Sequence, residues 1–315
     1  MKHKRLFALA LALALCMALP LAACSLKPAA TWESLRPTLE NLCPGGAEPV
    51  KGSGNVVDAQ TPLPTDLDCV KLRVEGFSFR GSGALETALV IDESLDRKIV
   101  LTADDNIAER ISVRYDAATG EIHVGPENHR TVFSPTKICV TVGAPVREIF
   151  ADGLWKISYD CPSVKDCRLT VEGSVNGDFI FGDLNSLDMN YNGLSTVSMT
   201  CKSVRDCRLY VDGSLNGKFD FGEMDSLDVN ISGLSTMNLS GTVRRAALRI
   251  DGGGTISAFG LIAQDADVSI EGLGNCEITA ERSLNASIDG GGRITYAGDP
   301  AVTRRIDGLG SIRAK

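Results

Sequence analysis

The sequence is poor in the side chains that enzymes most often use for catalysis and ligand stacking. Its 315 residues include three histidines and two tryptophans, and Phe, Trp and Tyr together make up 5%. His123 and His129 follow one predicted strand, whereas a zinc site or a histidine-based triad needs ligands from separate elements. We therefore expect both histidines to lie on the surface. Trp32 and Trp155 are too few to line a glycan-processing cleft.

Several catalytic motifs are also missing. The chain has no Gly-Lys-Ser phosphate loop, no Cys-x-x-Cys pair and no Gly-x-Ser-x-Gly nucleophile turn, which argues against nucleotide-dependent and hydrolase chemistry. Basic residues are in deficit, with 32 Lys and Arg against 40 Asp and Glu. The resulting net charge of −8 disfavours nucleic acid and anionic membrane surfaces as partners. We expect no cofactor and no resident metal.

The amino terminus has the pattern of a bacterial export signal. Basic residues at positions 2–5 precede an apolar run at positions 6–19, which is too short to span a bilayer stably. The segment Leu21-Ala22-Ala23-Cys24 resembles the lipobox of bacterial lipoproteins. This resemblance implies cleavage after residue 23, a lipid on Cys24 as the only membrane contact, and an outer-membrane location in a Gram-negative cell, because Ser25 is not Asp. Plain secretion with an incidental Cys24 is the alternative.

Residues 24–66 are predicted to form a flexible tether. Proline recurs throughout this segment and interrupts any long helix. The prolines are Pro28, Pro37, Pro44, Pro49, Pro62 and Pro64. We place the amino-terminal β part of the folded body at residues 67–150 and its repeats at residues 151–315.

Glycine recurs with a steady period through the second half of the chain. Nine turn glycines follow one another at a nearly constant spacing. They are Gly153, Gly173, Gly193, Gly213, Gly233, Gly252, Gly272, Gly290 and Gly308. Such a period over nine units is typical of a solenoid, in which each unit buries its apolar face only by stacking on its neighbours.

Apolar residues alternate with polar ones on both sides of each glycine, which indicates strand, turn, strand. No unit carries a helical pattern. The sequence therefore predicts an all-β, right-handed parallel β-helix with repeats of about 20 residues. Residues 161–200 and 201–240 share 23 of 40 identities, so a 40-residue coil is the alternative. The predicted inward residues include Val171, Val229, Ile231, Ile250, Ile256, Ile270, Ile278 and Ile288.

An acidic residue precedes seven of the turn glycines. These residues are Asp152, Glu172, Asp212, Asp251, Glu271, Asp289 and Asp307. Stacked along one edge they would form a ladder of carboxylates, and Ca²⁺ prefers oxygen ligands of this kind. Asp before Gly is also ordinary turn chemistry, because its side chain accepts local backbone N–H groups. We favour the turn interpretation.

The remaining cysteines suggest disulfides, because exported proteins fold in an oxidising compartment. Cys161 with Cys167, and Cys201 with Cys207, each bracket a Ser-Val-Lys/Arg-Asp segment. The repeat length decides the pairing. With 20-residue coils Cys161 and Cys201 lie two coils apart, about 9.6 Å and beyond disulfide reach, whereas 40-residue coils would stack them.

The repeat units resemble a known family. Leu248-Arg249-Ile250-Asp251-Gly252-Gly253-Gly254 and Ile306-Asp307-Gly308-Leu309-Gly310 are similar to the glycine-turn repeats of the family named "putative auto-transporter adhesin, head GIN domain". The segment Gly120-Glu121-Ile122-His123-Val124 is similar to its opening strands, and the resemblance covers residues 68–315. The family differs in having a middle serine where this chain often has Leu or Gly, and in having fewer cysteines. It implies a bacterial envelope protein without an established catalytic site, for which adhesion is inferred.

We therefore expect a non-enzymatic envelope lipoprotein that binds a surface protein or a glycan. Nine stacked units offer a long solvent face of the kind that repeat proteins use for binding. The predicted loops Pro162–Asp166 and Lys202–Asp206 are the expected epitope. A polysaccharide-processing β-helix enzyme of the lyase or pectinase type is one alternative, and a structural or signalling envelope module is another.

Overall fold

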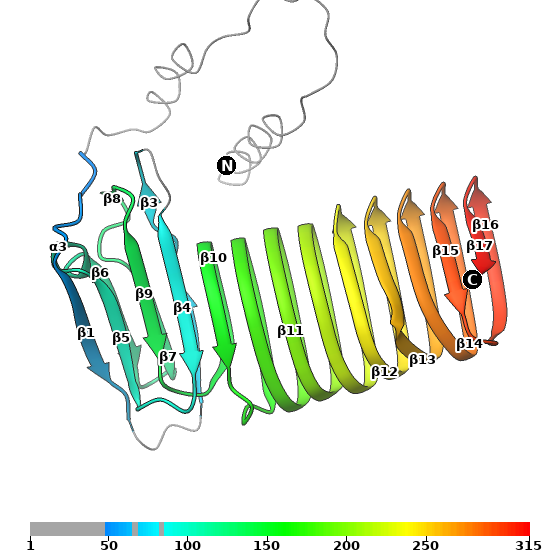
Figure 1. Ribbon diagram of the computed structural model, residues 1–315, viewed down its shortest axis with the longest axis horizontal. Helices are drawn as coiled ribbons and strands as arrows, with labels where there is room; N and C mark the ends of the chain where they lie inside the picture. The colour runs from blue at the N-terminus through cyan, green and yellow to red at the C-terminus, as the bar shows by residue number, and fades with distance from the viewer. Residues whose placement is uncertain (1–47, 65–68, 82–84) are drawn as a thin grey trace, which may run out of the picture. The chain divides into compact units, whose positions relative to one another are not determined.

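The computed structural model describes residues 48–64, 69–81 and 85–315. These residues form an all-β parallel solenoid of about eight turns with repeats of about 20 residues, as the sequence predicted. The turns follow one another along the long axis of the solenoid (Figure 1). Five long, bent strands build the main column. They are β10 (Val146–Asp160), β11 (Asp166–Gly233), β12 (Thr236–Gly252), β13 (Thr255–Gly272) and β14 (Asn275–Gly290).

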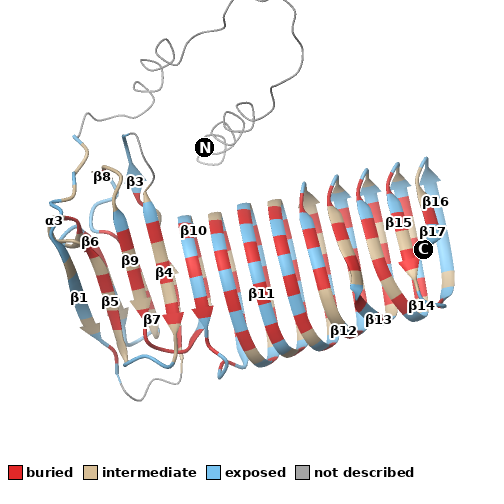
Figure 2. Ribbon diagram, viewed as in Figure 1, coloured by how far each residue is buried: buried red, intermediate tan, exposed pale blue. Residues whose placement is uncertain are grey.

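The core is a continuous apolar column inside these strands. Every second side chain points inward, which Figure 2 shows as the regular alternation of buried and exposed residues. The residues predicted to face inward all have exposed fractions of 2% or less, so that prediction is confirmed. They are Val171, Val229, Ile231, Ile250, Ile256, Ile270, Ile278 and Ile288. Full burial of one such aliphatic side chain contributes about 1.5–3 kcal/mol.

The register between neighbouring turns fixes the repeat length. β10 and β11 pair in parallel, with Gly153 opposite Gly173, and β12 and β13 pair with Gly252 opposite Gly272. In both cases a residue pairs with its equivalent one repeat later, at the shorter of the two coil lengths that the sequence allowed. The similarity between residues 161–200 and 201–240 therefore relates each turn to the turn two repeats later, not to the adjacent turn.

The turn glycines stack directly on one another. All nine have a positive φ, between 93° and 138°. At Gly272 a Cβ atom would lie 2.7 Å from the carbonyl oxygen of Gly252 in the preceding turn. Both the backbone conformation and the space exclude a side chain here. These turns form the upper edge of Figure 1, where the arrows of β12, β13 and β14 end.

The amino-terminal part adds two turns in an order that differs from the order of the chain. β2 (Val70–Val74) and β4 (Glu86–Asp92) pair in parallel with β10. β7 (Glu121–Pro126) and β9 (Lys137–Val142) pair in parallel with β2 and β4. The turn made by β2 and β4 therefore lies between β10 and the turn made by β7 and β9.

Antiparallel strands cover this end of the solenoid. β5 (Lys98–Asp104) pairs with β9, β6 (Ile111–Asp116) pairs with β7, and the short helix α3 (Asp105–Ala108) joins β5 to β6. β1 (Val56–Pro62) pairs antiparallel with β5. Because β1 lies within the predicted tether at 24–66, the folded body begins upstream of residue 67.

At the other end of the column an exposed arginine occupies the row that is buried in earlier turns. The register places Arg304 beside Ala286, in the inward row that Val268 and Leu248 occupy earlier. Its guanidinium lies 5.4 Å from the ring centroid of Tyr296, and such charges at a sheet end oppose strand addition. The short strands completing the fold are β3 (Ser78–Phe79), β8 (Val132–Phe133), β15 (Arg293–Ala297), β16 (Ala301–Gly308) and β17 (Ser311–Ala314).

The predicted export signal and Cys24 lie outside the described residues. Within residues 48–64, 69–81 and 85–315, no helix is long and apolar enough to cross a membrane.

The stacking of the turn glycines predicts an asymmetry between two adjacent residues. Gly290 has a φ of 127° and a Cβ there would lie 2.5 Å from the Gly272 carbonyl oxygen, so we expect Gly290→Ala to lower the free energy of unfolding by about 1–3 kcal/mol or more. At Gly291 a Cβ would meet only the end of the Leu273 side chain, so Gly291→Ala is the matched control. Denaturant titration of both variants checks this. Equal losses would contradict the stacking.

Candidate functional site

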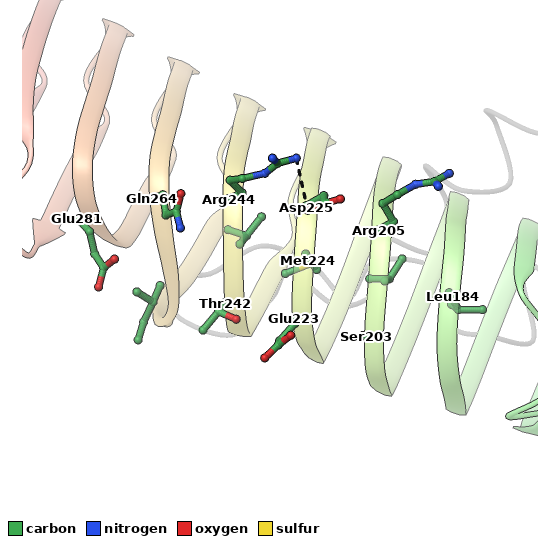
Figure 3. Close-up of a pocket in the computed structure, with 13 residues that line it drawn as sticks. Leu184, Ser203, Arg205, Glu223, Met224, Asp225, Thr242, Arg244, Gln264 and Glu281 are labelled. Carbon is green, nitrogen blue, oxygen red and sulfur yellow. Dashed lines mark ion pairs between the residues drawn. The ribbon is translucent and has the colours of Figure 1, made fainter.

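The solenoid bends a second time about halfway between successive turn glycines, and a groove follows this second edge. We call it the edge groove. Its volume is about 610 Å³, and residues from successive turns line it (Figure 3). The lining residues are Leu184, Ser203, Val204, Arg205, Glu223, Met224, Asp225, Thr242, Val243, Arg244, Ile262, Gln264 and Glu281.

The floor of the edge groove is apolar because the same position of each repeat turns inward. Leu184, Val204, Met224 and Val243 come from consecutive turns and expose between 1% and 7% of their surface. The residues on either side of each one point outward and are polar. From Leu184 to Glu281 the groove crosses about five turn spacings, or roughly 24 Å.

The rim of the edge groove carries both signs of charge. Arg244 Nη2 lies 3.4 Å from Asp225 Oδ1 (dashed in Figure 3), and Arg205 Nε lies 3.1 Å from Asp206 Oδ2. A hydrogen bond from the Ser226 hydroxyl, and then the bond from Arg205, lower the pKa of Asp206. This carboxylate therefore stays ionised at neutral pH and accepts hydrogen bonds.

Other charges on the rim are uncommitted. Glu223 and Glu281 are exposed, and neither carboxylate makes an ion pair or a hydrogen bond with another described residue. Exposed carboxylates beside an apolar floor suit the binding of a polar ligand that also has apolar surface.

The two segments predicted as an epitope both reach this edge, but only one is a loop. Pro162–Asp166 forms a turn, and both the backbone N–H and the hydroxyl of Ser163 donate to the carboxylate of Glu93. Lys202–Asp206 is part of strand β11, so the loop prediction is wrong there. The cause is the repeat itself, since the chain continues the parallel ladder around the bend. Val204 and Arg205 of this segment line the groove.

Trp155 lies in the core, and the two histidines lie beside the same acidic side chain. Trp155 is 3% exposed and its indole N–H donates to the Asp152 carbonyl, so it is a core residue. The side chain of His123 is 34% exposed and that of His129 is 78% exposed, so both rings reach the surface. Both rings lie beside Glu75, with Nε2 of His123 at 3.0 Å and Nδ1 of His129 at 3.5 Å from its carboxylate. The parallel pairing of β2 with β7 brings Glu75 close to both histidines.

The predicted acidic residues form a single row along the glycine edge. Asp152 lies opposite Glu172, and Glu271 lies between Asp251 and Asp289. Desolvation, and then the charge of Glu172, raise the pKa of Asp152, as expected for like charges on successive turns. In the described part of the chain no group of three His, Cys, Asp or Glu residues is arranged to hold a metal ion.

All seven described cysteines are free thiols in the structure. The observed repeat separates Cys161 from Cys201 by two turns, which excludes a bridge between them. Disulfides within the pairs Cys161 and Cys167, or Cys201 and Cys207, stay predictions. Burial raises the pKa of Cys161 and Cys201 to about 11 and that of Cys167 to about 12.

These thiols are expected to resist alkylation in the native protein. At pH 8 a raised pKa keeps them protonated, and only the thiolate reacts quickly. Iodoacetamide should therefore modify the partly exposed Cys69 and Cys139 well before Cys161 and Cys167, as measured by peptide mass spectrometry. Rapid native modification of Cys161 would contradict the structure. A second sample, unfolded without reductant, tests the disulfides, because bridged cysteines would stay unmodified.

Solved structures of bacterial proteins share the fold of this chain. A putative adhesin from Parabacteroides distasonis matches with a TM-score of 0.57 and 19% identity, and one from Parabacteroides merdae with 0.53 and 20%. A protein from Parabacteroides distasonis described as a putative lipid binding protein matches with 0.53 and 19%. Each alignment covers 85% of this chain and all of the other chain. No curated protein matches significantly.

A sequence model of a protein family identifies the family of this chain. The model described as "Putative auto-transporter adhesin, head GIN domain" matches residues 84–300, which is more than half of the chain. The match includes the turn glycines from Gly153 to Gly290 and two of the three segments that resemble the family, at residues 120–124 and 248–254. The chain therefore belongs to the family of putative auto-transporter adhesins with a head GIN domain.

Proposed function

We propose that this protein is a non-enzymatic adhesin of the bacterial cell envelope that binds its partner in the edge groove. The observation that carries the proposal is the continuity of the groove, in which an apolar floor and uncommitted carboxylates extend over roughly 24 Å of rigid solenoid. Binding residues on a rigid scaffold lose little conformational entropy on association, so a long shallow surface of this kind suits recognition.

The chemistry of the groove defines the kind of partner. Ionised carboxylates accept hydrogen bonds, and the guanidinium groups of Arg205 and Arg244 donate them. Apolar contact comes mainly from Ile262, which is 40% exposed and lines the groove beyond the almost fully buried floor. A surface protein or a glycan with hydroxyl groups and apolar faces offers the complementary set.

A lipid anchor is part of this proposal. Leu21-Ala22-Ala23-Cys24 supports acylation of Cys24, and the Pro-rich segment that follows would hold the solenoid away from the membrane. We expect the mature protein to begin with an acylated Cys24, which mass spectrometry of its first peptide detects. A Cys24→Ala variant that is processed normally and still fractionates with membranes would contradict the anchor.

Charge reversal in the groove tests the binding function. Glu223→Lys combined with Glu281→Lys changes two exposed residues without breaking an ion pair, and we expect it to weaken attachment at least tenfold. Immobilised matrix glycoproteins and a glycan array serve as surfaces, with soluble residues 48–315 as the analyte. Asp178→Lys is the matched control. Asp178 is an exposed strand residue that does not line the edge groove, and Lys218 occupies the equivalent position two turns later.

Two outcomes would overturn the proposal. Unchanged attachment of the double variant would exclude the edge groove as the binding site. Release of products from an acidic polysaccharide by the purified domain would instead favour the lyase-type alternative.

A further inference from the structure

A row of exposed leucines runs along the glycine edge, opposite the edge groove. Each one directly follows a turn glycine, in every second turn of the solenoid. They are Leu154, Leu194, Leu234, Leu273 and Leu309, and their exposed fractions are 50%, 59%, 69%, 72% and 95%. We call them the leucine row. It extends over eight turn spacings, or roughly 38 Å.

Small residues separate the leucines. Ser174 and Ser214 occupy the same position in the intervening turns of β11, and Gly253 and Gly291 occupy it further on. A Cβ atom on Gly253 would lie 2.8 Å from Leu234 Cδ2, so the leucine leans over the adjacent turn. A leucine of the row therefore covers the small residue of the next turn, and the row forms an apolar ridge along the edge.

The backbone holds these leucines in fixed positions. The amides of Leu234, Leu273 and Leu309 donate to the carbonyl oxygens of Gly213, Gly252 and Gly290 at 3.1, 2.9 and 2.8 Å. The fold does not need the leucine side chains, because turns with serine or glycine at this position have the same geometry. Five exposed leucines that do not contribute to the core are a surface available to a partner.

The spacing within the row discriminates between polypeptide conformations. Successive leucines are two turns apart, which is about 9.6 Å. A polyproline II helix repeats every three residues, or about 9.3 Å. Same-face residues of a strand repeat at about 6.7 Å, and an α-helix returns to the same face after seven residues, or about 10.5 Å. The polyproline II repeat fits best and stays in register over the length of the row.

The charge beside the row limits the partner further. The acidic row of the same edge, including Glu172, Asp212 and Asp251, runs two residues before the leucine position. Burial raises the pKa of Asp152, and the negative charge of Glu172 in the next turn raises it further. A second copy of this chain would bring two acidic rows together, and an anionic membrane would also be repelled. A cationic partner is attracted.

We infer that the leucine row and the acidic row together bind a basic segment of a partner protein in the polyproline II conformation, with an apolar side chain at every third residue. Apolar side chains of the segment pack against the leucines at matching spacing, and its lysine or arginine side chains meet the carboxylates. This surface is separate from the edge groove, and the inference does not depend on the proposed adhesin function.

A synthetic peptide tests the inference directly. The probe is a fluorescent 15-residue peptide with the sequence Pro-Lys-Leu repeated five times, and fluorescence polarisation measures its binding to residues 48–315. We expect saturable binding that weakens at least tenfold when salt is raised from 50 to 500 mM. The peptide with Glu in place of Lys is the charge control and should not bind.

The variant Leu194→Ser/Leu234→Ser/Leu273→Ser isolates the role of the leucines. Serine already occupies this position at 174 and 214, so the fold should be retained, and we expect at least a tenfold loss of peptide affinity. A circular dichroism melt verifies folding. Equal affinity of the variant and the unmodified protein, or no peptide binding by the unmodified protein at millimolar peptide, would overturn the inference.

Two further measurements distinguish the basic segment from other possible occupants of the same surface. Concentration-dependent dimerisation lost in the triple variant would assign the row to a second copy and overturn the inference. Leucine-dependent binding to phosphatidylcholine vesicles, without peptide binding, would assign it to a lipid surface and also overturn it.

Discussion

The whole molecule depends on the close contact of one turn glycine with the next. The stacked backbones at this edge set the spacing and the register of successive turns. The positions of the other rows of side chains follow from this spacing and register. A parallel ladder with a nearly constant offset places each position of the repeat in a straight row along the column. The apolar core, the acidic row, the leucine row and the edge groove are all rows of this kind. A side chain at one glycine would disturb the rows on both sides of it.

Periodicity explains why so much of the fold could be predicted. Glycines at a nearly constant interval, with alternating apolar residues on both sides, were enough to identify the solenoid and its inward residues. The same reasoning could not find the order of the amino-terminal turns, because β2 and β4 have only local patterns and their partner β10 lies much later in the chain. The sequence pattern also led to the wrong prediction of a loop at Lys202–Asp206. Polar residues around a bend resemble a loop when the parallel pairing of the strands is unknown.

The candidate site was less accessible to sequence reasoning than the fold. The edge groove combines residues from each of several turns, so its members are a full repeat apart in the sequence and form no motif. Its floor could be found only by reading Leu184, Val204 and Met224 as one row. Similarly, His123 and His129 meet Glu75 because β7 pairs with β2, and no spacing in the sequence indicates that contact.

The insertion of the β2 and β4 turn next to β10 has a consequence for the order of assembly. Turns from β10 onward join partners only one repeat away, and such short loops close quickly. Ala88 of β4 instead joins Lys156 of β10, several repeat lengths further along the chain. While the chain is being synthesised, β2 and β4 have no parallel strand of the main column to join until β10 has emerged. The amino-terminal end is thus made first but joins the column only when β10 has emerged, and the repeats that follow can then add turn by turn.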